Sequence, residues 1–143
     1  MRIGVPKEIK PQENRIGLTP DSVKTLVSEG HEVLVENNGG FEAGFDNDQY
    51  KNAGAKIIEK AADIFNDAEI IVKVKEPQKV EVEMIRENQI VYTYLHLAAA
   101  KELTEGLVKS KSINIAYETV TDDNGRLPLL APMSAVAGLS LIH

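Results

Sequence analysis

Short apolar runs alternate with amphipathic segments along the whole chain. The runs have the length and β-branched content of buried strands, whereas the segments between them place apolar residues at helical spacing. The predicted strands cover residues 3–5, 31–36, 55–58, 69–75, 89–95 and 112–117. The predicted helices cover residues 20–29, 46–53, 60–65, 80–85 and 98–108, and the segment after Pro132 could begin another. Because strands that alternate with helices are typical of βαβ units, we expect an α/β domain with a mainly parallel sheet and helices on both faces.

Local start and stop signals agree with this division. Thr19 has the position of an N-cap and Pro20 that of a first helical residue, while Gly30 is suited to end the helix that they begin. Gly54 closes the second helical segment. Pro77 stops the predicted strand at 69–75. We see no internal repeat or low-complexity tract, so one domain fits the pattern.

Composition narrows the class of protein. The 143 residues are 43% hydrophobic and 27% charged, which is ordinary for a globular domain. The net charge of −6 disfavours a nucleic-acid partner. The absence of cysteine excludes disulfides, thiolate catalysis and cysteine-based zinc sites, and no metal site is expected. No run resembles a signal-peptide core or spans a bilayer, so we expect a cytoplasmic protein with no membrane partner.

Polar, potentially reactive side chains follow several predicted strands. Arg15 lies in the loop after the first strand, Lys75 ends the strand at 69–75, His96 follows the strand at 89–95, and Glu118 follows the strand at 112–117. Ligands of an open parallel sheet bind beyond the carboxyl ends of its strands. We therefore expect these side chains to meet at one edge of the sheet.

Each of these residues also has a structural interpretation. Lys75 would fit a plain surface lysine, His96 a structural histidine, and Glu118 the partner of a neighbouring base. The lysines and tyrosines within the strands at 69–75 and 89–95 would also fit edge strands with one solvated face. Arg15 would fit a solvated surface, because its loop carries other charged residues, namely Lys7, Glu8, Lys10 and Glu13.

The combination of residue types nevertheless points to a particular ligand. Arginine binds a planar carboxylate through two parallel hydrogen bonds, and lysine can hold or polarise a carbonyl oxygen. Histidine is the side chain best suited to move a proton near neutral pH. Together, Arg15, Lys75 and His96 predict a site for a 2-oxo or 2-amino acid.

Several stretches resemble the alanine dehydrogenase family in order and spacing. They are RIGVPKEIKPQENRIGLTP (residues 2–20), VKVKEP (72–77), YTYLHLAA (92–99), AYETV (116–120) and LPLLAPMS (127–134). The resemblance implies an oxidoreductase that interconverts L-alanine with pyruvate and ammonia using NAD. It further implies a cytoplasmic homo-oligomer.

The resemblance also implies roles for individual residues. Arg15 and Lys75 would bind the substrate carboxylate and oxygen, and His96 would be the general acid and base. Tyr94 and Glu118 would lie at the substrate. Two residues further along would complete the site: Met133 would contact the substrate or nicotinamide, and Ser134 the cofactor's phosphates.

The resemblance covers one part of the family's architecture. It implies a Rossmann-like substrate domain over residues 1–132, and over residues 133–143 the start of the helix that crosses to a cofactor domain. The ten glycines do not form the Gly-x-Gly-x-x-Gly fingerprint of that cofactor domain. Ala135 and Leu139 also replace an acidic residue and an arginine that are usual in the family. We therefore expect a truncated form that binds no NAD and is inactive alone.

Two other functions remain open. A nucleotide-binding domain like that of the transhydrogenase alpha subunit shares the opening pattern of residues 2–20. A non-catalytic module that binds a partner or associates with itself would use apolar surface left exposed by a missing domain.

Overall fold

The structure is a computed structural model that describes residues 1–132. Its six strands form one sheet in the order β3-β2-β1-β4-β5-β6, and each neighbouring pair is parallel. The strands are β1 (Arg2–Val5), β2 (Glu32–Glu36), β3 (Lys56–Ile58), β4 (Ile70–Val72), β5 (Ile90–Thr93) and β6 (Ile113–Ala116). The parallel sheet predicted from the apolar runs is confirmed.

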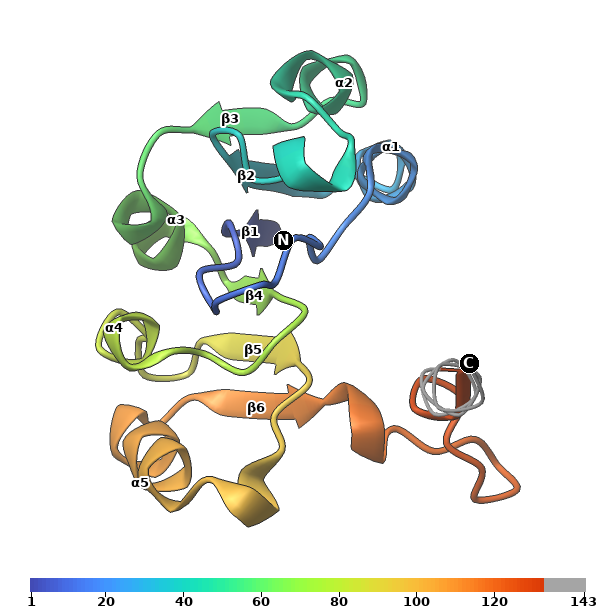
Figure 1. Ribbon diagram of the computed structural model, residues 1–143. Coiled ribbons are helices and arrows are strands. Elements are labelled where there is room, and N and C mark those ends of the chain that lie inside the picture. Colours follow the sequence, from blue (N-terminus) through green and yellow to red (C-terminus); the bar gives the residue numbers. More distant parts are fainter. Residues whose placement is uncertain (133–143) are drawn as a thin grey trace.

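Helices cover both faces of the sheet, as the sequence pattern predicted. Figure 1 shows α1 and α2 on one face and α3, α4 and α5 on the other. The α-helices within residues 1–132 are α1 (Pro20–Ser28), α2 (Asn47–Asn52), α3 (Ala61–Asp67), α4 (Lys79–Val82) and α5 (Lys101–Ser110). Short 3-10 helices are η1 (Phe41–Ala43), η2 (Leu97–Ala99) and η3 (Tyr117–Thr119). None of these described helices has the length and apolar character needed to cross a bilayer.

Helix α1 begins and ends as its sequence predicted. Thr19 is the N-cap, and its side-chain oxygen accepts the backbone N–H of Ser22 at 3.3 Å. Pro20 is the first helical residue, where no N–H is required. Gly30 follows the end of the helix with a φ of 93°, which glycine adopts without a steric penalty. The helix therefore ends before Glu32, where β2 begins and pairs with β1.

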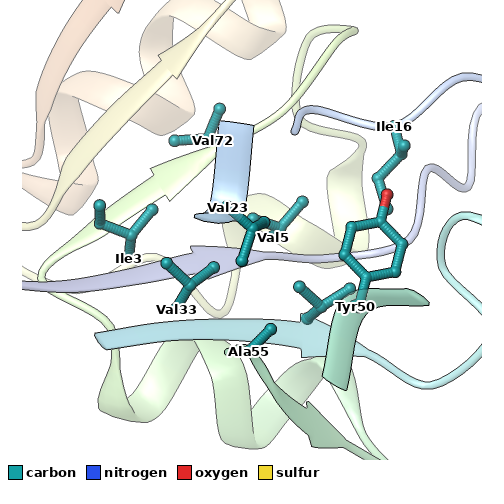
Figure 2. Packing of buried hydrophobic residues seen from close by; sticks show 9 residues of the cluster. Ile3, Val5, Ile16, Val23, Val33, Tyr50, Ala55 and Val72 are labelled. Atoms are coloured by element: carbon teal, nitrogen blue, oxygen red, sulfur yellow. The ribbon is translucent and has the colours of Figure 1, made fainter. Parts of the chain in front are cut away.

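The two faces of the sheet have separate hydrophobic cores. Figure 2 shows Val23 of α1 and Tyr50 of α2 packed over Val5 and Val33 of the sheet. Ile64 and Phe65 of α3, Ile71 of β4 and Leu107 of α5 are members of the core on the opposite face. Helix α3 approaches β1 closely, because a Cβ built on Gly4 would lie 2.6 Å from Cγ2 of Ile64. Burial of each large apolar side chain contributes about 1.5–3 kcal/mol, so both helical layers are held firmly on the sheet.

The direction of strand addition reverses at β1. The chain adds β2 and β3 on one side of β1 and then returns to add β4 on the other side. Such a reversal opens a crevice at the carboxyl ends of the two central strands, where the connecting loops diverge. The loop after β1 and the segment after β4 flank this crevice, and these two segments carry Arg15 and Lys75.

The central strands are shorter than predicted. Strand β4 ends at Val72 rather than residue 75, and β5 ends at Thr93 rather than residue 95. Beyond Val72 the N–H groups of Val74 and Lys75 donate to the Glu8 carboxylate instead of to a neighbouring strand. The edge-strand interpretation of these segments is wrong, since both strands have neighbours on each side.

The fifth helix also begins later than predicted. The predicted helix started at residue 98, but α5 starts at Lys101 because residues 97–99 form the 3-10 helix η2. The shift leaves His96 in a separate turn directly after β5 rather than at the start of the long helix.

Candidate functional site

Arg15 lies in the loop after β1 and is held by Glu13. Its Nε and Nη2 groups donate to the two carboxylate oxygens of Glu13 at 2.9 and 2.7 Å, and its backbone N–H donates to Oε2 at 3.0 Å. The Glu13 side chain is 6% exposed, whereas that of Arg15 is 53% exposed. The hydrogen bonds found within residues 1–132 leave the Nη1 end of the guanidinium available for a second carboxylate.

Lys75 follows β4 on the other side of the strand-order reversal. Its backbone N–H donates to Oε1 of Glu8 at 3.0 Å, and its carbonyl oxygen accepts from the hydroxyl of Thr93 at 2.8 Å. The main chain is therefore fixed from both sides. The side chain is half-buried and forms no ion pair with any other residue in the part of the chain that the structure describes.

A buried ion cluster lies directly behind Lys75. The ammonium of Lys73 is 3.1 Å from a carboxylate oxygen of Glu8 and 3.1 Å from one of Glu81, and the three side chains are 1%, 1% and 2% exposed. The cluster joins the loop after β1, the end of β4 and helix α4. Glu8, one of the charged residues on which the solvated-surface interpretation of Arg15 rested, is therefore buried, and it neutralises a buried lysine that directly follows β4.

The charge balance of the cluster affects Glu81 in particular. Burial raises the pKa of the Glu81 carboxyl, and the Lys73 ammonium opposes that shift. One lysine faces two acids here, so the cluster carries an excess negative charge when both acids are ionised.

His96 follows β5 in an unusual backbone conformation. Its φ is 51° and its ψ is 40°, which is left-handed and costs a non-glycine residue about 1–2 kcal/mol. Its backbone N–H donates to Oε1 of Glu118 at 2.9 Å, and that of Leu95 donates to the same oxygen at 3.0 Å. His96 is exposed, so its side chain is open to a ligand at this edge. Strained backbone of this kind is concentrated at functional sites.

Glu118 is ionised more readily than an ordinary glutamate. Although burial raises its pKa, the backbone N–H donors of His96 and Leu95 and the charge of His96 bring the pKa below its usual value. The carboxylate is therefore a stable acceptor for the turn that carries His96.

Tyr94 connects β5 with the segment after β6. Its hydroxyl donates to the carbonyl oxygen of Leu129 at 2.7 Å, and its ring packs edge-on against Tyr117 with centroids 4.7 Å apart. Burial raises the pKa of the Tyr94 hydroxyl, the Arg15 charge opposes that shift, and the Glu118 charge adds to it. Both charges therefore act on the Tyr94 hydroxyl, in opposite directions.

The predicted residues lie on segments that leave the sheet at the carboxyl ends of its strands. The side-chain hydrogen bond from Arg15 lowers the pKa of Glu13, and the charge of Lys75 acts in the same direction. Glu118 accepts the backbone N–H of His96. That these side chains share one ligand stays a prediction. Two other predicted contacts, Met133 and Ser134, lie outside the described residues.

Sequence reasoning missed two of the glutamates that hold these residues, namely Glu8 and Glu13. Glu8 follows the end of β1 by three positions, and a lysine at position 73 of a buried strand requires an acid nearby. Those two facts together could have identified Glu8. Glu13 had a weaker signal, since an acid two residues before an arginine is common on exposed loops.

One cavity in the described part of the chain lies apart from this edge. A cleft of about 610 Å³ lies between α4 and α5, and its lining includes Pro77, Val82 and Leu103 but none of the predicted site residues. Within residues 1–132 the predicted site residues lie at the carboxyl edge of the sheet and do not line this cleft. In the same part of the chain no group of histidine and acidic side chains could hold a metal ion.

Comparisons with known proteins agree on a single family. The family model for the alanine dehydrogenase/PNT N-terminal domain matches residues 4–137. The alanine dehydrogenases of Staphylococcus epidermidis and Halomonas elongata are each 51% identical to this chain over 138 residues, and that of Methanococcus maripaludis is 49% identical. Each match covers 96% of this chain but 37% of the relative, so the chain spans little more than a third of their length.

Solved structures give the same result. An L-alanine dehydrogenase superposes with a TM-score of 0.93 and 52% identity, covering 96% of this chain and 38% of the other. A transhydrogenase from Sinorhizobium meliloti superposes with a TM-score of 0.77 and 28% identity, covering 82% of this chain and 35% of the other.

Proposed function

This chain belongs to the alanine dehydrogenase/PNT N-terminal domain family, and we propose that it forms the substrate-binding part of an L-alanine dehydrogenase. The complete reaction converts L-alanine, NAD+ and water to pyruvate, ammonium, NADH and a proton, and it is reversible. The observation that carries the proposal is the position of Arg15 and Lys75 on the segments that flank the strand-order reversal, one on each side. Two cations on opposite sides of one crevice suit a small anion that has a second polar group.

Each residue has a task in the proposed site. The free end of the Arg15 guanidinium binds the substrate carboxylate, and the Lys75 ammonium donates to the 2-oxo oxygen or the carboxylate. His96 accepts a proton from the substrate nitrogen or from water in one direction and returns it in the other. Tyr94 borders the substrate, and Glu118 accepts the backbone N–H of His96.

The described residues do not fit the pyrophosphate of NAD. Dinucleotide-binding sheets receive it at a glycine-rich turn after the first strand, where backbone N–H groups are free. Here a Cβ built on Gly17 would lie 2.6 Å from the carbonyl oxygen of Val72, so this glycine serves contact between the loop and β4. Pro20, at the start of α1, offers no N–H. We propose that NAD is bound outside residues 1–132, with Ser134 at its phosphates and Met133 at the nicotinamide or substrate.

Self-association is the second candidate function. Ile113 and Ile115 lie on the edge strand β6 and are 50% and 41% exposed, although strand isoleucines are usually buried. An apolar strip at a sheet edge suits contact with further protein. This strip supports the proposal of a homo-oligomer. The transhydrogenase-like alternative is less favoured, because that structure is less similar in both sequence and fold.

Calorimetric titration of the 143-residue chain with pyruvate tests the proposed function. Arg15→Ala and Lys75→Ala should each weaken pyruvate binding about 10-fold or more, since each removes a charge-assisted hydrogen bond. Lys7→Ala is the matched control, because Lys7 is an exposed cation on the same loop, and it should bind as the wild type does.

Two outcomes would contradict the proposal. Binding of NADH without binding of pyruvate would favour the transhydrogenase-like alternative. NADH oxidation by the isolated chain with pyruvate and ammonia at ordinary dehydrogenase rates would show that the cofactor site had been misplaced.

A further inference from the structure

The three residues proposed to act on the substrate share one unexpected feature. The backbone N–H of each one donates to a glutamate carboxylate rather than to a carbonyl oxygen of the sheet. Two of these contacts join distant parts of the chain, separated by 67 and 22 positions. The pairs are Arg15 with Glu13 at 3.0 Å, Lys75 with Glu8 at 3.0 Å, and His96 with Glu118 at 2.9 Å.

The carboxylates act where the sheet no longer fixes the main chain. Strand β4 ends at Val72 and β5 at Thr93, so Lys75 and His96 lie beyond the regular ladder. A hydrogen bond to the residue's own N–H fixes its backbone, and with it the direction of its Cα–Cβ bond. At His96 this bond also offsets part of the cost of the left-handed conformation.

We propose that Glu8, Glu13 and Glu118 are positioning residues that aim Lys75, Arg15 and His96 at the small acid. The inference rests on the proposed function for the identity of the ligand. Each acid acts through its partner and makes no contact with the substrate in this scheme. For Glu118 the scheme replaces the substrate contact that the family resemblance implies.

Three acids near an anionic ligand require compensation, and each has it. Glu8 is paired with the buried ammonium of Lys73 at 3.1 Å and also accepts the N–H of Val74 at 3.2 Å. Glu13 is paired with the guanidinium that it orients. Glu118 accepts two backbone N–H groups. The three carboxylates are therefore compensated by hydrogen-bond donors of the protein, and the Arg15 and Lys75 side chains keep further donors for the ligand.

Glutamine is the informative substitution at these positions. It keeps the size of the side chain but replaces one acceptor oxygen with an NH2 donor. In Glu8→Gln that donor meets the Lys73 ammonium or a backbone N–H, so one bond to the residue 74–75 segment is lost. In Glu118→Gln the oxygen that accepts from both Leu95 and His96 loses its negative charge, and the 3.3 Å contact of Leu95 with the second oxygen is lost.

The test measures pyruvate affinity and amide resonances of the 143-residue chain. Glu8→Gln, Glu13→Gln and Glu118→Gln should each weaken pyruvate binding about 10-fold, because small misplacements of aligned groups cost this much or more. Each should also shift the amide proton of its own partner. Glu69→Gln is the matched control, since Glu69 accepts the N–H of Arg2 at 2.6 Å at the opposite end of the sheet. It should shift the Arg2 amide and leave pyruvate affinity unchanged.

The outcomes separate positioning from simple stability. Unchanged pyruvate affinity in Glu8→Gln and Glu118→Gln, with the partner amides shifted, overturns the inference. So does a loss of affinity in Glu69→Gln as large as in the other variants. If Glu8→Gln fails to fold, the triple variant Glu8→Gln/Lys73→Met/Glu81→Gln removes all three buried charges, and it should fold yet bind pyruvate as weakly.

Failure of the proposed function gives a different result. If the wild-type chain binds no pyruvate, the proposed function is refuted for this chain. Positioning is then decided by the χ1 couplings and amide exchange of Lys75 and His96. Altered rotamer populations in Glu8→Gln and Glu118→Gln, but not in Glu69→Gln, support positioning, whereas unaltered populations overturn it.

Discussion

Replacement of Lys73 by methionine would remove the one cation in the buried ion cluster. Lys73 is 1% exposed and lies 3.1 Å from each of Glu8 and Glu81, which are themselves 1% and 2% exposed. Methionine fills a similar volume, so loss of packing contributes little. The expected effect therefore comes from two acids that remain inside the protein without a counter-charge.

The magnitude follows from the burial of these acids. Breaking a buried ion pair by removing one partner costs about 3–5 kcal/mol, since the remaining charge is uncompensated. For a domain of this size that corresponds to a fall of roughly 10–20 °C in Tm. Glu8 keeps two backbone donors, so the value should lie toward the lower end.

The pH dependence has a definite sign. Burial already raises the pKa of Glu81, and removal of Lys73 eliminates the attraction that opposes this shift. An acid with a raised folded-state pKa stabilises the fold below its unfolded pKa of about 4.3, and this contribution is lost as the pH rises toward the folded value. The difference in unfolding free energy between wild type and Lys73→Met should therefore be larger at pH 7 than at pH 4.

Urea unfolding followed by circular dichroism at both pH values is the assay. Lys101→Met is the control for loss of one lysine, because Lys101 is 91% exposed and its contact with Glu105 is 3.9 Å long. It should leave the unfolding midpoint almost unchanged. A loss below about 1 kcal/mol for Lys73→Met at pH 7, or a loss independent of pH, would refute the reasoning on the cluster.

Three further predictions concern other parts of the structure. Gly17→Ala would place a Cβ 2.6 Å from the Val72 carbonyl oxygen, so it should separate the Arg15 loop from β4, lower the stability and weaken pyruvate binding. Gly125→Ala is the control, because no atom lies within 4 Å of its Cβ position, and it should affect stability alone. Equal pyruvate affinity in both variants would contradict this prediction. Tyr50→Phe removes a hydroxyl that donates to the Leu18 carbonyl oxygen at 2.8 Å, and unfolding should become easier by about 1–2 kcal/mol, with an unchanged midpoint as the contrary result. Because the pKa of Glu118 is lowered in the folded state, its carboxylate stabilises the fold above the unfolded pKa of about 4.3. As the pH drops from 5 to about 3, the unfolding free energy should therefore fall less steeply in Glu118→Gln than in the wild type. An equal pH dependence of the unfolding free energy in both proteins would contradict the assigned contacts.

The sheet and its helices could be predicted because their signals are local. Apolar runs define the six strands, and Thr19, Pro20 and Gly30 define the first helix without reference to distant residues. The carboxyl ends of parallel strands meet at one edge, so the general position of Arg15, Lys75, His96 and Glu118 also followed from the pattern. Strand ends were overestimated, since Val74, Tyr94 and Leu95 extend the apolar pattern past the last residues of β4 and β5.

The partners of the site residues depend on long-range contacts. Glu8 and Lys73 are separated by 65 positions, and nothing in the loop sequence distinguishes a buried acid from its exposed neighbours. His96 adopts its left-handed conformation next to the Glu118 carboxylate, which accepts its N–H and comes from a different strand end. These features required the three-dimensional arrangement.

A crystal structure of the chain with pyruvate would test the central claim most directly. The account predicts the pyruvate carboxylate within hydrogen-bond distance of the Arg15 guanidinium, the Lys75 ammonium beside the ligand oxygens, and the His96 imidazole facing the 2-oxo carbon. Pyruvate bound elsewhere, for example in the cleft between α4 and α5, would contradict the account, as would a crystal grown at saturating pyruvate with none bound at this edge.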